Sequence, residues 1–425
     1  MHVGKYRFQP ERVDKADLCA HCFRYRRVAF LECDLGQSEF TPPGMVALNI
    51  IEQPIFGRSP PNFVFRGVID TKTGPPFTHP TIPNFAHFVG ATSPRSSPSH
   101  YIAAIEALLQ SYRLDVQSPA INHGADDQED DREADVIPLV VNTMGWTKGL
   151  GADLALKIEN MIQPTAIFEI KIPTSKTSWQ ADVLPPCAAD SYFGHQPKIH
   201  LLEPVVAPIL SMNYTPADHR TISILSYFHC VFPTKNPREL QQVSATSWDT
   251  DLPLCARPPY EVDWSTAIDK FVLAGAGMED VVAAEVKRVL NGAIIGLVSC
   301  SPDTIDLGDG ATSTSDHPVP YFQGSPPPSP LTSNCFGLAL IRAVSPSSTH
   351  MHVLTPLSPR FLSKSRVAVK GELELPVWGM LDTFQADGVA GVAKGKVPYL
   401  QWGKGKGLGA ERRRVRRNLM RKGQM

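Results

Sequence analysis

An unbroken apolar run at Val28–Leu31 is the clearest strand pattern in the chain. β-Forming residues without a polar alternation are typical of a strand that is covered on both faces of a parallel sheet. The run ends on Glu32 and Asp34, which a Gly-Gln pair and a Pro-Pro-Gly turn follow. Ligands of such sheets bind beyond the carboxyl ends of the strands, so the two acids mark either a ligand site or the cap of a turn.

An order of strand, turn and helix continues along the first half of the chain. Apolar residues at helical spacing predict a helix over His100–Leu114, after proline-rich loops that extend to about residue 98. Val136–Asn142 predicts a second buried strand, which leads through a glycine-rich turn into a helix-like segment, and Thr165–Ile170 predicts a third strand. This order predicts an α/β fold with a doubly wound sheet.

The pattern changes in the second half of the chain. Thr215 precedes a proline and an acid, an N-cap signature that predicts a helix up to His229. Beyond about residue 230 most of the predicted elements are strands. The predicted strands lie over Gly292–Cys300 and Gly371–Trp378 and in a hairpin of Cys335–Val344 with Met351–Thr355. One helix is predicted in this half, over Met278–Leu290.

These patterns divide the chain into four parts. Its 425 residues are too many for one ordinary core and suggest two domains. The parts are an irregular N-terminal segment (1–26), an α/β core (27–235) with an acidic insertion (123–135), a β-rich C-terminal domain (236–383) with a flexible loop (301–334), and a basic tail (384–425). The acidic insertion is expected to be a solvated loop.

Composition places the chain among soluble globular proteins, with 42% hydrophobic and 20% charged residues. No apolar run approaches the roughly 18 to 20 residues of a membrane span, and the start of the sequence lacks the apolar core of a signal peptide. We therefore expect a cytosolic or nuclear protein without a membrane partner. A single C-x-x-C at Cys19 and Cys22 has no second pair, so reduced, buried thiols are preferred to a zinc site.

The net charge of −1 conceals a strong asymmetry. From Lys394 to Met425 there are eleven Lys or Arg and one acid, so this segment carries +10 and the rest of the chain −11. A basic segment on an acidic body points to nucleic acid or to an acidic partner. Val415, Leu419 and Met420 form a narrow apolar stripe there, which favours docking over a merely solvated or nuclear-import segment.

Six motifs, in order along the chain, together resemble one family. They are ECDLGQSEFTPPG, GPPFTH, FVGATSP, NTMGWTKGLG, RTISILSYFH and VPYLQWGKGKGLGAERRRVRRNLMRKGQM. The family is that of the nucleolar polynucleotide 5′-hydroxyl kinases of ribosomal-RNA processing, which is related to the RNA kinase subunit of the mRNA 3′-end cleavage factor. The resemblance implies a P-loop-type kinase core over 27–235, a lid helix at 215–229, and a C-terminal domain that supports a nuclease.

The resemblance also implies an activity and its partners. The family transfers phosphate from ATP to the 5′-hydroxyl of cleaved pre-ribosomal RNA, so ATP and Mg²⁺ are the expected cofactors. The expected partners are RNA and the endoribonuclease of ribosomal spacer processing, and the expected location is the nucleolus within the nucleus.

The phosphate-binding loop of the family is not found in the sequence. That loop reads G-x-x-x-x-G-K-[ST], and its backbone N–H groups and lysine hold the nucleotide phosphates. No Gly-Lys pair of the chain is followed by Ser or Thr; the pairs are Gly4-Lys5, Gly395-Lys396, Gly403-Lys404 and Gly405-Lys406. We expect either an N-terminally incomplete sequence or a natural variant. A second hypothesis is a catalytically incompetent scaffold subunit of the nuclease complex.

The acidic motif supplies the candidate catalytic and cofactor residues. Asp34 matches the second acid of the family motif and is expected to accept the proton of the 5′-hydroxyl or to hold the Mg²⁺ water shell. Glu32 stands in the place of the first acid and is expected to contact the cofactor. Gln37 is expected to orient a water or the metal shell, or else to bond its own backbone as a turn residue.

Three further residues are candidates for contact with RNA and phosphate. Trp146, flanked by glycines, is expected to stack a nucleobase or, alternatively, to pack on the helix that follows. Lys148 is expected to meet the RNA backbone. Arg220 lies where the family carries lid arginines and is expected to neutralise the transferring phosphoryl group, unless Asp218 holds it in an ion pair.

Overall fold

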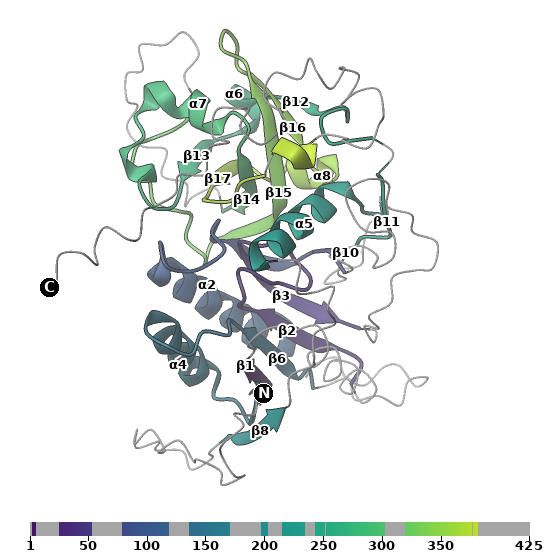
Figure 1. The fold of residues 1–425 in the computed structure, drawn as a ribbon, viewed down its shortest axis with the longest axis vertical. Helices are drawn as coiled ribbons and strands as arrows, with labels where there is room; N and C mark the ends of the chain where they lie inside the picture. Colours follow the sequence, from purple (N-terminus) through teal and green to yellow (C-terminus); the bar gives the residue numbers. More distant parts are fainter. Residues whose placement is uncertain are drawn as a thin grey trace, which may run out of the picture.

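The computed structural model describes residues 2–5, 25–52, 79–118, 136–170, 197–202, 215–233, 243–250, 252–301, 319–375 and 377–380. Within these ranges the chain forms two large sheets, a first one in purple and blue in the lower half of Figure 1 and a second one in green above it. None of the described helices combines the length and the apolarity that a bilayer crossing requires.

The first sheet has seven strands in the order β5-β3-β2-β6-β1-β7-β8. They are β1 (His2–Lys5), β2 (Val28–Glu32), β3 (Met45–Ile51), β5 (Phe85–Phe88), β6 (Leu139–Thr143), β7 (Ala166–Ile170) and β8 (Lys198–Leu202). Five neighbouring strands from β2 to β8 run parallel, whereas β3 pairs antiparallel with both β2 and β5. The predicted α/β sheet is therefore confirmed, with an antiparallel edge.

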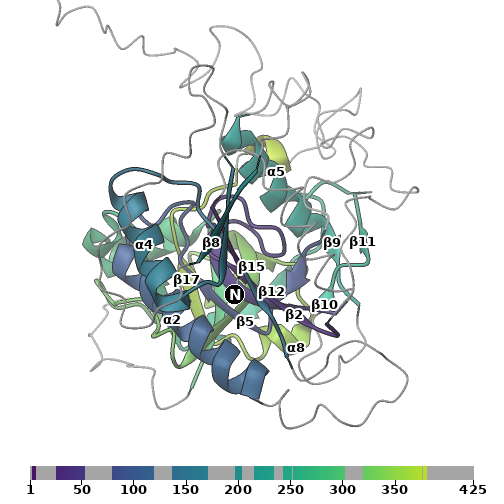
Figure 2. The same ribbon diagram turned by 90° about the horizontal axis from the view of Figure 1, so that it is seen from below.

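Two helices cover one face of this sheet. Residues of α2 (Pro98–Ser111) and α4 (Leu150–Ile162) share an apolar core with alternate residues of β2, β3 and β6. Helix α2 continues into a π-helical turn at Tyr112–Gln117. A third helix, α5 (Pro216–His229), lies on the other side of the strands (Figure 2). The helices predicted near residues 100, 150 and 215 are all confirmed.

Four strands of the first sheet were not predicted, namely β1, β3, β5 and β8. Residues 1–26 were expected to be irregular, but His2–Lys5 form β1, in register between β6 and β7. Proline-rich loops were expected up to residue 98, yet β3 is buried at all seven positions and β5 pairs with it. The connection from β2 to β3 ends at Gly44, whose φ of 89° suits glycine, and β3 then runs back antiparallel along β2. Of the prolines that the structure describes between β2 and α2, none lies in a strand.

The second sheet has six strands, in the order β12-β16-β15-β14-β17-β13, and is antiparallel except for the pair β13 and β17. The strands are β12 (Tyr260–Asp263), β13 (Lys270–Leu273), β14 (Ile294–Cys300), β15 (Ser333–Val344), β16 (His350–Leu354) and β17 (Val367–Lys370). Short helices flank it: α6 (Trp264–Ala267), α7 (Val286–Leu290) and α8 (Pro359–Leu362). The predicted hairpin of β15 with β16 and the strand β14 are confirmed.

Two predictions for this half were wrong. The helix expected over Met278–Leu290 is broken, because Val281 and Val282 are extended between two 3₁₀ turns and only Val286–Leu290 is α-helical. Adjacent β-branched residues disfavour a continuous helix there. The strand expected over Gly371–Trp378 lies earlier, at Val367–Lys370, and the chain turns out of the sheet at the glycine.

Two short ladders join the halves of the chain: β4 (Thr81–Ile82) pairs with β10 (Val243–Ser244), and β9 (Cys230–Val231) pairs with β11 (Ser247–Trp248). The division expected at residue 235 stays a prediction. The segment Cys19–Cys22, the acidic insertion, residues 302–318 of the flexible loop and the basic tail lie outside the described residues.

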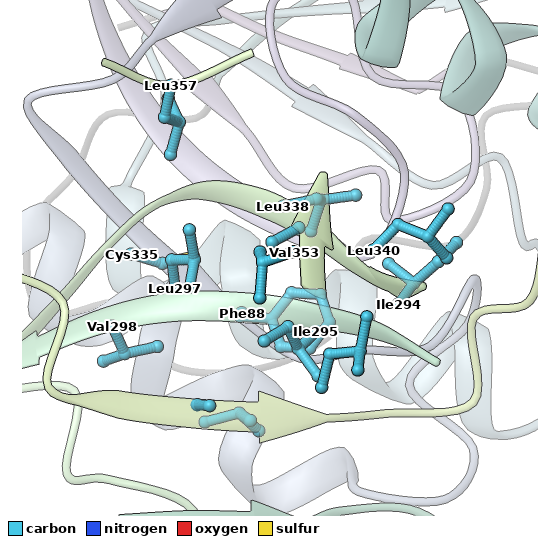
Figure 3. Packing of buried hydrophobic residues seen from close by; sticks show 14 of the residues in the cluster. Phe88, Ile294, Ile295, Leu297, Val298, Cys335, Leu338, Leu340, Val353 and Leu357 are labelled. Carbon is cyan, nitrogen blue, oxygen red and sulfur yellow. The ribbon is translucent and has the colours of Figure 1, made fainter. Parts of the chain in front are cut away.

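One apolar core spans the junction between the sheets. Figure 3 shows Phe88, the last residue of β5, among side chains of the second sheet such as Ile295 and Leu297. Its ring lies over Gly296, where an added Cβ would be 2.5 Å from the ring. The carbonyl of Gly90 accepts hydrogen bonds from the N–H groups of Glu372 at 2.7 Å and Leu373 at 3.1 Å. The second sheet is thereby fixed against the end of β5.

Candidate functional site

Asp34 lies in the turn just beyond the carboxyl end of β2. Its Oδ1 accepts hydrogen bonds from the backbone N–H groups of Gly36 at 2.7 Å and Gln37 at 3.1 Å. Burial raises the pKa of Asp34 above its ordinary value, while these two N–H groups and the charge of Arg220 oppose the rise. Within the described part of the chain no hydrogen bond engages Oδ2. This oxygen is therefore open to a ligand.

Glu32 is fully buried at the end of β2. Its Oε1 accepts hydrogen bonds from the backbone N–H of Asp34 at 3.1 Å and from Nδ2 of Asn142 on β6 at 2.8 Å, and its Oε2 accepts one from the N–H of Glu39 at 3.1 Å. Both carboxylate oxygens are thus in use. The placement suits a residue that orients Asp34, and the expected contact of Glu32 with the cofactor stays a prediction.

Gln37 reaches Asp34 through its backbone N–H, which is a turn-type contact. Its side chain is half-buried. The expected role of the side chain toward water or metal stays a prediction.

Arg220 lies on α5 close to the turn that carries Asp34. The Cδ atom of Arg220 is 3.7 Å from the position that a Cβ at Gly36 would occupy, and the guanidinium charge lowers the pKa of Asp34. Asp218 is engaged elsewhere, because its Oδ2 accepts hydrogen bonds from the N–H of Thr215 at 2.8 Å and from its hydroxyl at 2.6 Å. This capping box fixes the start of α5 and leaves Arg220 to face the carboxylate turn.

Trp146 follows β6, the strand beside β2. It is half-buried and packs on α4, where a Cβ added at Gly151 would be 2.2 Å from the Cβ of Trp146. The guanidinium carbon of Arg95 lies 5.2 Å from the centroid of the indole. The packing contact is thus present, and the ring also has a face that a cation covers. Lys148 is exposed two residues further on.

The loop from residue 89 to residue 97 joins the two parts of the site. The carbonyl oxygen of Thr92 is 3.3 Å from the position of a Cβ at Gly36, and Arg95 reaches Trp146 three residues later. Helix α2 begins after this loop, and its buried Tyr101 hydroxyl donates to the carbonyl of Cys33 at 2.8 Å. Thr92, Arg95 and Tyr101 could not be recognised from the sequence, because spacing along the chain does not indicate contacts across a sheet edge.

The arrangement suits a small number of metal ligands. Among the described residues no group of three or more His, Cys, Asp or Glu could hold a metal ion by itself. Mg²⁺ in phosphoryl-transfer sites takes one or two carboxylates and fills the rest of its shell with phosphate and water. Asp34, with its open oxygen, fits that requirement. Glu32, with both oxygens engaged, does not.

Strand β1 has the position from which a phosphate loop would start. It is parallel to β6 and β7, with Lys5 at its carboxyl end in register with Thr143 and Glu169. In P-loop proteins a glycine-rich loop follows such a strand. Residues 6–24, which follow β1, lie outside the described residues and contain no such motif. The chain therefore has a strand in this position, and its sequence lacks the G-x-x-x-x-G-K-[ST] motif.

The carboxyl-terminal half of α5 is anchored in the second sheet. Tyr227 is fully buried, and its hydroxyl accepts a hydrogen bond from the N–H of Leu338 on β15 at 2.9 Å. Gly337 leaves the space for this hydroxyl, since a Cβ there would be 2.3 Å from it. The helix that carries Arg220 is therefore held at one end by the second sheet.

Replacing Tyr227 with phenylalanine is expected to lower the free energy of unfolding by about 1–3 kcal/mol, because the buried N–H of Leu338 loses its acceptor. Urea denaturation measures the effect. The exposed Tyr260 provides a matched control, and its replacement by phenylalanine is expected to change stability by less than about 0.5 kcal/mol. Equal effects of the two variants would contradict an anchoring role for Tyr227.

The chain is similar to one family of known proteins. Residues 18–229 match the family described as "mRNA cleavage and polyadenylation factor CLP1 P-loop". The chain is 36% identical over 437 residues to "Polynucleotide 5′-hydroxyl-kinase GRC3" of Cryptococcus neoformans var. neoformans serotype D (strain B-3501A), which covers 94% of this chain and 53% of the relative. It is 28% identical over 427 residues to the protein of that name from Schizosaccharomyces pombe, with 94% and 51% covered. The chain spans about half the length of these curated relatives.

Solved structures show the same fold. Two structures of Clp1p with Pcf11p align with TM-scores of 0.51 and 0.50, each at 14% identity, and cover 88% of this chain and 74% of the other. At this identity the likeness concerns the fold alone. It agrees with the mixed α/β sheet and the β-rich second sheet described above.

Proposed function

Because the chain belongs to the Grc3/Clp1 family of P-loop proteins, we propose that it acts as an ATP-dependent polynucleotide 5′-hydroxyl kinase on cleaved pre-ribosomal RNA. One observation carries the proposal. A half-buried carboxylate with an open oxygen, Asp34, lies beside the guanidinium of Arg220 at the carboxyl edge of a parallel sheet. Phosphoryl transfer to a hydroxyl needs an acceptor for the proton and positive charge for the phosphoryl oxygens.

The chemistry assigned to this chain is proton transfer and charge neutralisation. Asp34 Oδ2 accepts the proton of the attacking 5′-hydroxyl or holds a water of the metal shell, while its Oδ1 stays bonded to Gly36 and Gln37. Arg220 faces the transferring phosphoryl group from α5. Bound Mg²⁺ would neutralise phosphate charge beside Asp34. Glu32 holds the backbone of Asp34 in place.

The RNA is proposed to bind at the carboxyl end of the neighbouring strand β6. Trp146 stacks a nucleobase there, a contact that tolerates any base because every base has a π face. Lys148, which is exposed, meets the phosphate backbone. The half-buried state of Trp146 supports this assignment, since its packing on α4 holds the ring in a fixed orientation at the sheet edge.

Replacing Trp146 with alanine is expected to weaken the binding of single-stranded RNA by roughly 5- to 150-fold, which corresponds to about 1–3 kcal/mol for one stacked base. The affinity for ATP is expected to stay unchanged. Equilibrium binding of labelled RNA and labelled ATP measures both, and replacement by phenylalanine, which keeps a stacking surface, should restore much of the RNA affinity. Equal losses for RNA and ATP would mean that the indole only packs.

The kinase proposal has a direct test. The chain is incubated with ATP labelled in its γ-phosphate and with RNA that bears a 5′-hydroxyl, and the label is expected at the 5′ end. RNA that already bears a 5′-phosphate is the control and should stay unlabelled. No transfer to the 5′-hydroxyl RNA by a folded chain would overturn the proposal.

A scaffold subunit is the second candidate function, and one observation favours it: no Gly-Lys pair of the chain precedes Ser or Thr. Without a phosphate cradle the chain would hold ATP poorly and serve a nuclease through its second sheet and tail. A chain that fails to bind ATP but co-purifies with the endoribonuclease of ribosomal spacer processing would support this function.

The cellular setting is part of the same proposal. The relatives are named polynucleotide 5′-hydroxyl kinases, and the solved Clp1p structures hold a partner protein, Pcf11p. By analogy we assign this chain an endoribonuclease partner and a nucleolar location. The eleven basic residues between 394 and 425 support contact with RNA or with that partner.

A further inference from the structure

The guanidinium of Arg95 has one described contact, with the indole of Trp146. Its carbon lies 5.2 Å from the ring centroid, and the side chain is exposed. Within the described residues the N–H donors of Arg95 make no hydrogen bond or ion pair. The guanidinium is planar and has five N–H donors, so at this sheet edge it can still donate hydrogen bonds to a ligand.

The backbone holds both partners of this contact in place. Arg95 follows Pro94 in a turn that the N–H of Ser97 closes on the carbonyl of Pro94 at 3.2 Å. The start of the loop is fixed as well, because the N–H of Gly90 donates to the carbonyl of Gly44 at 3.0 Å. Trp146 in turn packs on the first turn of α4. The fold therefore fixes the backbone on both sides of the contact.

Arg95 covers the surface that a nucleobase would need. If Trp146 stacks a base, as proposed above, the guanidinium must leave the indole. An exposed cation–π contact is weak, whereas a charge-assisted contact of arginine with phosphate is strong and often bidentate. A polynucleotide supplies both replacements together, since each base is joined to a phosphate. A free nucleoside supplies only the base.

We propose that Arg95 is an RNA-binding residue that covers Trp146 in the free protein and moves to the phosphate next to the stacked base when single-stranded RNA binds. The proposal rests on the RNA-binding role of Trp146 and adds a second residue to that site. This exchange favours the binding of a polynucleotide over that of a single nucleoside. Only a polynucleotide offers Arg95 a phosphate contact in place of the cation–π contact that it loses.

Arg95→Gln tests the proposal in equilibrium binding of labelled single-stranded RNA at a series of salt concentrations. We expect a 5- to 10-fold loss of affinity at low salt, and a slope of log K against log salt that is smaller by about 0.7, the value for one phosphate contact on a single strand. Arg95→Lys keeps the charge and should keep the slope. Arg360→Gln is the matched control, because that guanidinium lies 4.5 Å from the ring of Phe361 in the second sheet region; it should change neither quantity.

The outcomes separate this inference from the proposed function. If Trp146→Ala weakens RNA binding while Arg95→Gln leaves the affinity and the salt slope unchanged, Arg95 is only a surface cover and the inference is overturned. Tighter binding by Arg95→Gln would overturn it too, since the guanidinium would then be a competitor alone. If Trp146→Ala has no effect on RNA binding, the proposed function of Trp146 fails first and the role of Arg95 with it.

Discussion

Replacing Asp34 with asparagine is expected to abolish phosphoryl transfer to a 5′-hydroxyl while the fold stays intact. The amide keeps the shape of the side chain and its carbonyl oxygen can still accept from Gly36 and Gln37. It cannot take up the hydroxyl proton, and removal of a general base costs typically 100- to 10,000-fold in rate. Transfer of labelled phosphate to 5′-hydroxyl RNA at saturating ATP measures the loss. Asp153→Asn, at an exposed acid of α4, is the matched control and should keep full activity.

The same variant has an expected effect on stability that shows why the loss is not caused by unfolding. Burial raises the pKa of Asp34, so the folded protein binds its proton more tightly than the unfolded chain does. The stability from this group is complete below the ordinary carboxyl pKa and is lost as the pH rises through the raised pKa. Asparagine is uncharged like the protonated form of Asp34, so the variant does not lose this stability as the pH rises.

Thermal unfolding should therefore show Asp34→Asn melting above the wild type at neutral pH, with the difference shrinking to nothing in acid. An inactive variant with that pH dependence would tie the activity to the carboxylate. Undiminished turnover would rule out Asp34 as base or metal ligand. A lower melting temperature at neutral pH would contradict the assignment of a destabilised buried charge.

The elements with strong local patterns could be predicted from the sequence. Continuous apolar runs gave β2 and β6, since a strand covered on both faces needs no polar alternation. Thr215 and the acid three residues later gave the start of α5, because a capping box satisfies its own backbone groups. These features depend on residues that are close in the chain.

Elements whose burial depends on distant partners could not be predicted in this way. Strand β1 has four residues and exists as a strand because β6 and β7 flank it. The close approach of Gly90 to Gly371 joins positions far apart in the sequence, and no sequence pattern predicts it. The broken segment at 278–290 shows the reverse case, in which an acceptable helical pattern yields to two extended valines.

Some residues of the candidate site could also be predicted from the sequence, whereas others depend on contacts between distant parts of the chain. The family motifs brought Asp34 and Arg220 to attention, but the sequence left an ion pair of Arg220 with Asp218 open. The structure decides that point, because the carboxylate of Asp218 bonds Thr215. No sequence pattern indicated Arg95 as a site residue, because its contact with Trp146 joins the loop after β5 to the end of β6 across the sheet edge.

Replacing Phe88 with alanine is expected to lower the free energy of unfolding by about 3–5 kcal/mol, the usual cost of removing a buried phenylalanine ring. The side chain is 4% exposed and lies over Gly296 in the core that both sheets share. Since whole domains have only about 5–15 kcal/mol of stability, the loss would be large. Denaturant unfolding followed by circular dichroism measures it.

The shared core gives this prediction a second part. If the ring joins the two sheets, its loss should weaken their coupling, and the unfolding of the variant should broaden or separate into two steps. Phe168→Ala is the matched control, because Phe168 is half-buried on β7, the neighbour of the edge strand β8, and its ring centroid lies 4.9 Å from that of His200. This variant should cost less and leave the transition single. Equal costs for the two variants, with a single transition in both, would mean that the sheets are held together by the Gly90 backbone contacts and not by the ring.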